Sequence, residues 1–211
     1  MANSARIEVE PDPVPIVLIL AATLRRAART PKLAAAIGRV KGNVALKSTT
    51  DPQAATMRFG SGGVMVVRGI SSDTDVVIAA DLNTMADKNA PTPKIRGLAR
   101  HPKLTMTVGK LLEPPHGTWQ QEAERFFTFA LERPRVPRSI RVVNTDDGSE
   151  LVLGERPVAY ELHGSEHALM NVFLGNTVLG QDLLDGKLFA VGKLAHLAEL
   201  TGSSLAWMLG Q

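Results

Sequence analysis

The most informative part of the chain is residues 158–200, with the sequence VAYELHGSEHALMNVFLGNTVLGQDLLDGKLFAVGKLAHLAEL. Its apolar groups are short and are separated by glycines and polar residues, which is typical of short strands and helices in alternation. Ser165 is placed to cap a helix. This pattern predicts an α+β fold in which helices cover a mixed sheet. The expected elements are a strand over 157–162, helices over 166–174 and 177–184, a strand over 187–191 and a final helix over 193–200.

The residues before this stretch extend the same pattern. A helix is predicted over residues 119–131, where apolar residues recur at helical spacing. Residues 140–144 and 151–154 should pair as a hairpin, because Asp147-Gly148 between them suits the positive φ angles of a tight turn. Pro114-Pro115 marks a domain boundary.

The first half of the chain begins with residues 1–13, an acidic and proline-rich stretch that we expect to be a flexible leader. From there to Val40 the pattern is helical. Pro31 should divide it into two helices, because proline lacks a backbone donor and disfavours helical geometry in the preceding residue. An antiparallel meander of four strands, a short helix and a further strand are predicted next. Their residues are 44–49, 54–59, 64–69 and 75–82 for the meander, 95–100 for the helix and 104–108 for the last strand.

A local repeat links the two halves. Residues 103–111, KLTMTVGKL, match residues 187–194, KLFAVGKL, with one residue dropped. Each copy follows a run of predicted strands, as an internal duplication would produce. We therefore expect two related units over residues 14–113 and 114–211, either as tandem units or as one enlarged, pseudo-duplicated domain.

On these residues the chain resembles the sterol carrier protein type 2 family. The resemblance is best over residues 119–205, and residues 14–113 resemble a more divergent copy. Its landmarks are LHGS at residues 162–165, the apolar helix that ends in FLG at 173–175, LLDGKL at 183–188 and VGK at 191–193. The resemblance implies a five-stranded sheet backed by helices, with an apolar tunnel between the layers for sterols, fatty acyl chains or similar ligands. It carries no catalytic set, so we expect a lipid carrier that is not an enzyme.

A lipid site requires continuous apolar surface and few polar groups. Methionine suits such a wall, since its unbranched thioether adapts to varied shapes. Each candidate could equally fill an ordinary packed core. The candidate ligand-binding residues are Leu169, Met170, Phe173, Leu183, Leu184, Phe189, Leu197 and Leu200 in the second half, and Val67, Val77, Ala79 and Met106 in the first.

The composition limits the compartment and the chemistry. The 211-residue chain has no cysteine, which excludes disulfides, thiolate metal sites and a cysteine nucleophile, and which fits a reducing cytoplasm. Its longest apolar run, residues 14–24, is shorter than the roughly 20 residues of a membrane span. We expect a cytoplasmic protein that uses neither a metal nor another cofactor.

Basic residues follow this apolar run, although the net charge of the chain is only +3. Arg25, Arg26, Arg29 and Lys32 could contact an anionic membrane surface transiently. Nucleic-acid binding is not favoured, because the stretch has almost no aromatic side chains on which bases could stack.

Two alternatives stay open. The fold could serve as a non-catalytic scaffold or dimerisation module for a lipid-processing partner, with a closed interior and an exposed apolar patch. Residues 163–167, HGSEH, also fit the H-x-x-E-H pattern of inverted zinc peptidases, which would give a zinc-dependent hydrolase that uses His163 and His167. Gly164 and Ser165 interrupt that pattern, because a serine cap would leave His163 outside the helix.

Overall fold

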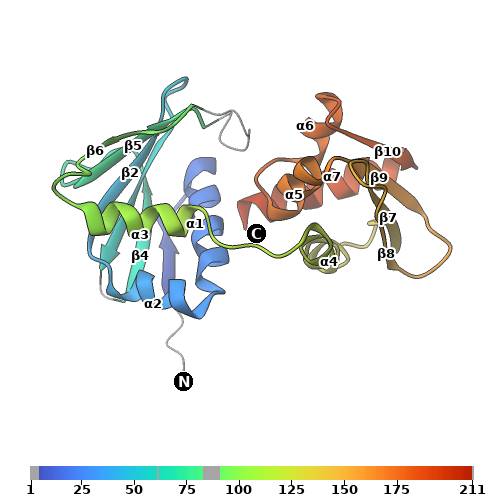
Figure 1. Cartoon of the computed structure of the whole chain (residues 1–211), viewed down its shortest axis with the longest axis horizontal. Coiled ribbons are helices and arrows are strands. Elements are labelled where there is room, and N and C mark those ends of the chain that lie inside the picture. Colours follow the sequence, from blue (N-terminus) through green and yellow to red (C-terminus); the bar gives the residue numbers. More distant parts are fainter. Residues whose placement is uncertain (1–4, 61, 83–90, 211) are drawn as a thin grey trace. The chain divides into compact units, whose positions relative to one another are not determined.

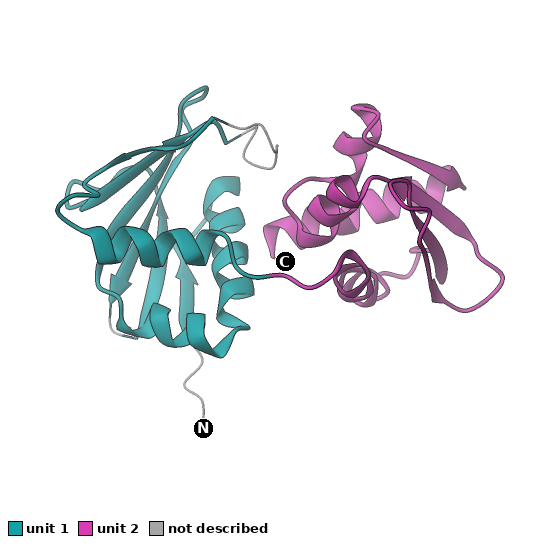
Figure 2. Cartoon of the chain, viewed as in Figure 1, with its two compact units in different colours: residues 1–115 teal, residues 116–211 magenta. Residues whose placement is uncertain are grey.

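The computed structural model describes residues 5–60, 62–82 and 91–210 (Figure 1). The chain divides into two compact units, residues 1–115 and 116–211 (Figure 2). Unit 1 contains a six-stranded mixed sheet and unit 2 a four-stranded mixed sheet, and the described residues also form seven helices. The predicted α+β class is thus confirmed.

Three helices form the helical layer of unit 1. They are α1 (Pro15–Ala28), α2 (Pro31–Arg39) and α3 (Pro102–Leu112), and each has a proline in its first turn. A proline is tolerated there because the first N–H groups of a helix have no partner within it. The break between α1 and α2 lies at Thr30, as Pro31 predicts.

The sheet of unit 1 has the strand order β1-β4-β3-β2-β5-β6. The strands β2, β3 and β4 form the predicted antiparallel meander, but β5 lies beside β2 and runs parallel to it. The prediction of a four-stranded meander is therefore wrong at its last strand. The strands are β1 (Arg6–Val9), β2 (Gly42–Ser48), β3 (Ala54–Gly60), β4 (Gly63–Arg68), β5 (Val76–Ala80) and β6 (Lys94–Arg96).

A crossing segment after β4 explains this strand order. The Thr56 hydroxyl of β3 donates to the carbonyl of Gly69 at 2.8 Å and accepts from the Ser71 N–H at 3.1 Å. At the far end of the segment, the backbone N–H of Asn43 donates to the Asp75 carboxylate at 2.8 Å. The segment is therefore tied to β3 and then to β2, which brings β5 to the far side of β2.

Residues 6–9 form a strand, β1, within the segment that was predicted to be a flexible leader. Residues 6–9 pair in parallel with β4, and Arg6 lies opposite Gly63, where an added Cβ would overlap the Arg6 carbonyl. The Arg68 guanidinium holds the next residues, with Nε 3.1 Å from the Glu10 carboxylate and Nη2 2.7 Å from the Asp12 carbonyl. The described part of the leader is thus integrated into unit 1.

Two further predictions fail near the end of unit 1. The predicted strand over 104–108 lies within α3, and the predicted helix over 95–100 overlaps β6. Leu104, Val108 and Leu111 are buried at helical spacing, so burial on one face of a helix outweighs the local strand preference. The two similar sequences, residues 103–111 and 187–194, therefore adopt different structures. The first lies in the helix α3, and the second contains the strand β10.

Unit 2 combines four helices with the strand order β10-β9-β7-β8. Thr118 and Gln121 form a capping box at the start of α4, and Ser165 caps α5 as predicted, since its hydroxyl accepts from the Ala168 N–H at 3.3 Å. The elements are α4 (Trp119–Ala130), β7 (Ser139–Asn144), β8 (Glu150–Gly154), β9 (Tyr160–Gly164), α5 (Glu166–Leu174), α6 (Leu179–Leu184), β10 (Leu188–Gly192) and α7 (Leu194–Leu209).

The two units share a strand topology. In each, a strand pairs antiparallel with the next one (β2 with β3, β7 with β8) and parallel with a later one (β5, β9). That later strand then pairs antiparallel with a last strand, β6 or β10. On this topology β6 corresponds to β10. Unit 1 extends its sheet beyond β3 with β4 and β1.

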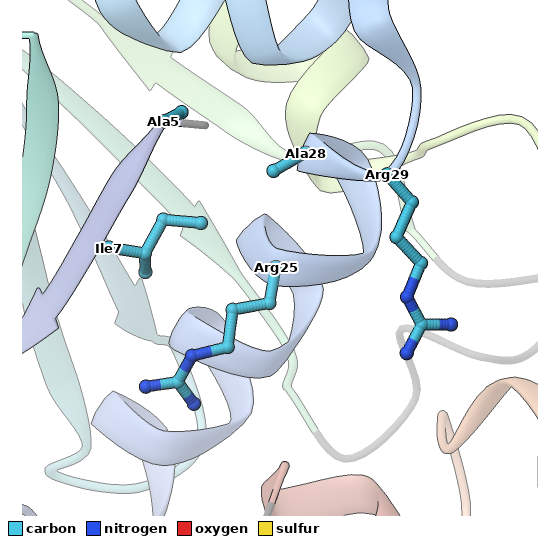
Figure 3. Close-up of a pocket in the computed structure, with 5 residues that line it drawn as sticks. All are labelled: Ala5, Ile7, Arg25, Ala28 and Arg29. Carbon is cyan, nitrogen blue, oxygen red and sulfur yellow. The ribbon is translucent and has the colours of Figure 1, made fainter. Parts of the chain in front are cut away.

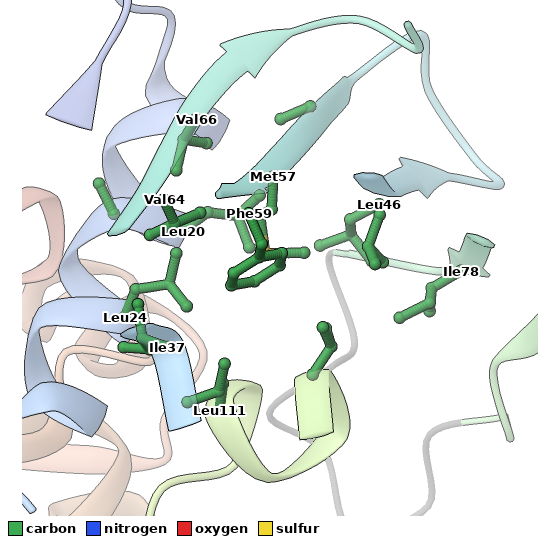
Figure 4. Close-up of a cluster of buried hydrophobic side chains, with 14 of the residues drawn as sticks. Leu20, Leu24, Ile37, Leu46, Met57, Phe59, Val64, Val66, Ile78 and Leu111 are labelled. Atoms are coloured by element: carbon green, nitrogen blue, oxygen red, sulfur yellow. The ribbon is translucent and has the colours of Figure 1, made fainter. Parts of the chain in front are cut away.

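Each unit has its own apolar core. Figure 4 shows that of unit 1, where Leu20 and Leu24 of α1 face Phe59 and Val64 of the sheet. The core of unit 2 includes Phe173, whose ring centroid lies 5.8 Å from that of Phe126 on α4. The Trp207 indole of α7 donates to the Phe173 carbonyl at 2.7 Å. Phe173 thus joins α4, α5 and α7.

Replacing this side chain should selectively weaken unit 2. We expect Phe173→Ala to lower the free energy of unfolding of unit 2 by about 3–5 kcal/mol, because it leaves a cavity among packed neighbours. Leu184→Ala, at a residue that is 85% exposed, should change it by less than about 0.5 kcal/mol. Urea unfolding followed by tryptophan fluorescence reports on this unit, since Trp119 and Trp207 are the only tryptophans. Equal effects of the two substitutions would contradict the assignment of Phe173 to the core.

Candidate ligand-binding site

The structure divides the candidate residues of unit 2 by their burial. Leu169, Phe173 and Leu200 are at most 2% exposed and belong to the packed core. The wall that these three were predicted to form is therefore filled by protein. Met170, Leu183 and Leu197 are only partly buried and pack against the outside of this core.

The other two candidates of unit 2 lie on its surface, together with two residues that the sequence analysis missed. All four belong to one short segment, which comprises the end of α6, the strand β10 and the start of α7. We call these four side chains the apolar surface of unit 2. They are Leu184 (85% exposed), Phe189 (53%), Val191 (55%) and Leu194 (79%).

The strand β10 explains part of this exposure. Side chains alternate between the two faces of a strand, and Leu188 is buried in the core while Ala190 packs against it. Phe189 and Val191 consequently face outward. Gly164 lies opposite Leu188 on β9, where an added Cβ would overlap the Leu188 side chain. This glycine therefore makes room for the residue that fixes the register of β10.

Polar contacts hold the α6 end of the segment. Asp182 is 1% exposed, and its carboxylate accepts a 2.6 Å hydrogen bond from the Thr177 hydroxyl and lies 3.5 Å from the Lys187 ammonium. The Lys187 N–H also donates to the Asp182 carbonyl at 2.9 Å. A hydrogen bond to the Asp185 carboxylate, 3.0 Å away, raises the pKa of Lys187. These contacts fix the turn that leads from α6 into β10.

The helix α6 is short and packs mainly against α7 and β10. The N–H of Leu179, its first residue, donates to the buried Ser204 hydroxyl of α7 at 2.9 Å. Leu183 is partly buried one turn later, whereas the neighbouring Leu184 points to solvent. The C-terminal end of α6 thus lies at the boundary between core and surface.

A polar network borders Phe189 on the outer face of the sheet. The Phe189 ring stacks on the His163 imidazole of β9, with ring centroids 4.3 Å apart. His163 Nε2 lies 3.1 Å from the Glu161 carboxylate, which also accepts a hydrogen bond from Arg141 of β7. The Arg141 and His163 hydrogen bonds, in that order, lower the pKa of Glu161. The apolar surface therefore ends against a row of paired charges.

The two histidines of the HGSEH motif are separated by the cap between them. His163 belongs to β9 and His167 to α5, as the serine cap predicts. The His167 imidazole lies 3.2 Å from the Asn171 amide, one turn along the same helix. Over the described ranges, no three His, Cys, Asp or Glu side chains are grouped so that they could hold a metal ion. The geometry gives the zinc-site alternative no support.

The candidates of unit 1 do not line a space between its sheet and helices. Val64 and Val66 of β4 and Val76 and Ile78 of β5 face the core, so Val67, Val77 and Ala79 point to the opposite face of the sheet. Val67, Val77 and Ala79 therefore do not lie between the sheet and the helices of unit 1, where they were expected. Met106 is 63% exposed on α3, because its segment forms a helix instead of the predicted strand.

Unit 1 instead has a pocket of about 290 Å³ between β1 and the last turn of α1 (Figure 3). Ala5, Ile7 and Ala28 contribute its apolar lining, and Arg25 and Arg29 its basic lining. The other two basic residues singled out in the sequence lie elsewhere. Arg26 donates to the Thr23 hydroxyl at 3.1 Å, and Lys32 is exposed on α2.

The Glu161 pairs predict a dependence of stability on pH. A carboxylate with a lowered folded-state pKa stabilises the fold above its unfolded-state pKa of roughly 4.3, and this contribution is lost as the pH falls through the folded-state pKa. Glu161→Gln should therefore lower the melting temperature at neutral pH, and the difference from the wild type should shrink towards about pH 3. Thermal melts over this range test the prediction, with Glu155→Gln in the exposed turn after β8 as control. A difference that stays constant with pH would contradict it.

Two comparisons with known proteins find no match for this chain. A scan against models of protein families finds no match, and a search of curated proteins finds no significant one.

Across the part of the chain that the structure describes, no helix has the length and apolar character needed to cross a bilayer.

Proposed function

We propose that the chain binds a lipid, sterol or acyl-chain ligand as a carrier, without catalysis, and that unit 2 binds it at the apolar surface. The observation that carries this proposal is the exposure of Leu184, Phe189, Val191 and Leu194 within one short segment. Single exposed apolar residues are common on proteins, but a group of large ones indicates a binding surface. The lack of cysteine fits a protein that acts in the cytoplasm.

The energetics favour an apolar occupant. Each Å² of apolar surface removed from water contributes about 25 cal/mol, so covering a leucine or phenylalanine side chain fully contributes about 1.5–3 kcal/mol. A ligand that covers Leu184 and Leu194 would obtain most of this free energy from each, because both side chains are mainly exposed. A flexible chain or a flat ring system would cover them with few polar requirements.

A deeper binding mode follows from the position of α6. Met170, Leu183 and Leu197 lie between the packed core and the surface, and α6 carries one of them. A ligand that displaces the C-terminal end of α6 would gain contact with these residues, and Met170 can adapt its shape to it. The tunnel that the family resemblance implies would then form when ligand binds.

The filled core also favours a second candidate function. The candidate residues that would line an internal cavity are packed in the core of unit 2; they are Leu169, Phe173 and Leu200. This is expected for a scaffold whose apolar surface binds a protein partner. The two functions differ in the kind of molecule that covers the apolar surface of unit 2. A carrier binds an isolated fatty acid, whereas a scaffold requires the complementary surface of a partner.

Fluorescent fatty-acid titration separates these functions. We expect the full chain to bind dansyl-undecanoic acid and the double variant Leu184→Ser/Leu194→Ser to bind at least roughly tenfold more weakly, because two apolar contacts are lost. Leu205→Ser is the matched control, since Leu205 is an exposed leucine of α7 outside the segment. It should leave the affinity within about twofold. Equal affinity of the double variant and the wild type would refute the proposed site.

A further inference from the structure

The strand β10 lies at an open edge of the sheet of unit 2 (Figure 1). It pairs antiparallel with β9 on one side, and no described strand pairs with it on the other. In an antiparallel ladder, every second residue turns its N–H and C=O groups away from the neighbouring strand. Within the described ranges, residues 188–192 make no backbone hydrogen bond outside this ladder. Their outward groups are therefore available to a further strand.

This edge lacks the protection that the other described edges have. Charged side chains or proline usually prevent an edge strand from pairing with another chain. The edge strands β1 and β6 of unit 1 each contain two charged residues, and β8, at the other edge of unit 2, contains Glu150. The sequence of β10, LFAVG, contains neither a charge nor a proline, and its Phe189 and Val191 are exposed. Among these edges, β10 is therefore the one suited to pairing.

We infer that β10 pairs antiparallel with β10 of a second copy of this chain, in a register centred on Ala190. A twofold axis at Ala190 sets Phe189 of each copy opposite Val191 of the other. Pairs of an aromatic and a β-branched residue across two strands stabilise a sheet. Twofold dimers, in which one surface pairs with itself, are the commonest soluble homo-oligomers. The two four-stranded sheets would form one continuous sheet.

The inner face of this register is also complementary. Leu188 of each copy lies opposite Gly192 of the other, and both residues are on the core side of the strand. On β9, Leu188 already lies opposite Gly164, where an added Cβ would overlap the leucine side chain. In the dimer, Leu188 thus has a glycine as its neighbour on both sides, and no bulky side chain obstructs it.

The charges at the two ends of β10 favour a second copy as the partner. Lys193 is exposed and has extended backbone angles, φ −75° and ψ 137°, so the register continues to it and sets it beside Lys187 of the other copy. The Lys187 ammonium lies 3.0 Å from the Asp185 carboxylate and 3.5 Å from the Asp182 carboxylate. This group has a net negative charge, which Lys193 of the other copy balances at both ends of the paired strands.

Pairing at this edge would enlarge the apolar surface of unit 2. Phe189 and Val191 of both copies lie together on the outer face of the joined sheet, and His163 and Glu161 of β9 border them on each side. The inference goes beyond the ligand proposal, because it concerns the edge of the sheet and requires no ligand.

Sedimentation equilibrium of the full-length chain tests the pairing. We expect the average mass to rise from that of one chain towards that of two between about 5 and 500 µM, a range that covers weak specific interfaces. A mass of one chain at every concentration would overturn the inference. A mass that rises beyond two chains would also overturn it, since a twofold pairing of β10 is closed.

A charged substitution in β10 tests whether this strand forms the contact. Val191→Lys sets an ammonium opposite Phe189 of the other copy, and it should weaken association at least roughly tenfold. Met106→Lys is the matched control, because it makes the same kind of change at an exposed apolar residue of unit 1. It should leave the association within about twofold. Equal effects of the two substitutions would contradict the inference.

Mixing two variants tests the register. Phe189→Glu should also weaken self-association, because a carboxylate then faces Val191. When Phe189→Glu and Val191→Lys chains are mixed, the new carboxylate faces the new ammonium, and the mixture should associate at least roughly tenfold more tightly than either variant alone. Both replaced side chains are more than half exposed, so each variant should keep the far-UV circular dichroism of the wild type. No gain on mixing two folded variants would overturn the proposed pairing.

The outcome is separate from that of the ligand proposal. A chain that forms the dimer but does not bind dansyl-undecanoic acid would leave the pairing of β10 in place and contradict the carrier function. A chain that binds the fatty acid and stays monomeric would contradict the pairing alone.

Discussion

The packing of Leu188 against Gly164 is the contact on which the surface of unit 2 depends. Gly164 has no side chain, so the Leu188 side chain can lie over this position of β9 and enter the core. Once Leu188 faces inward, the pleat of the strand directs Phe189 and Val191 outward. Antiparallel pairing then sets Phe189 opposite His163, and the stacked rings form the border between the apolar and the charged parts of the face.

A related constraint operates in unit 1, with a different result. Parallel pairing of β5 with β2 reproduces the arrangement of β9 and β7, but unit 1 adds β4 and β1 beyond β3. Gly63 permits the close approach of β1, since an added Cβ would overlap the Arg6 carbonyl. The extra edge strand then faces α1 and creates the pocket. One topology thus presents an apolar surface in one unit and a basic, partly apolar pocket in the other.

Several features could be predicted from the sequence because they depend on local chemistry. Pro31 divides the first two helices, and Ser165 caps α5 and separates His163 from His167. The helix α3 was missed because Thr105, Thr107 and Val108 favour strands locally, whereas its one-sided burial is a property of the folded unit. The pairing of β1 with β4 was also missed, since it joins residues far apart in the chain.

The candidate site could be predicted only in part, for a related reason. Leu184 and Phe189 were identified as apolar residues, but the sequence alone does not separate them from Phe173, which has the same chemical character and fills the core. Val191 could have been added from the alternation along β10 if Leu188 had been assigned to the interior, whereas Leu194 lies in α7, beyond this strand. Burial is decided by packing, which composition and periodicity describe only indirectly.

Paramagnetic relaxation from a fatty acid with a nitroxide label on its chain tests the central claim most directly. When such a ligand is added to ¹⁵N-labelled protein, the account predicts that the amide signals of residues 184–194 broaden most strongly in unit 2, with weaker effects at Met170 and Leu197. Broadening that avoids this segment, or none in unit 2 at ligand concentrations that saturate binding, would contradict it.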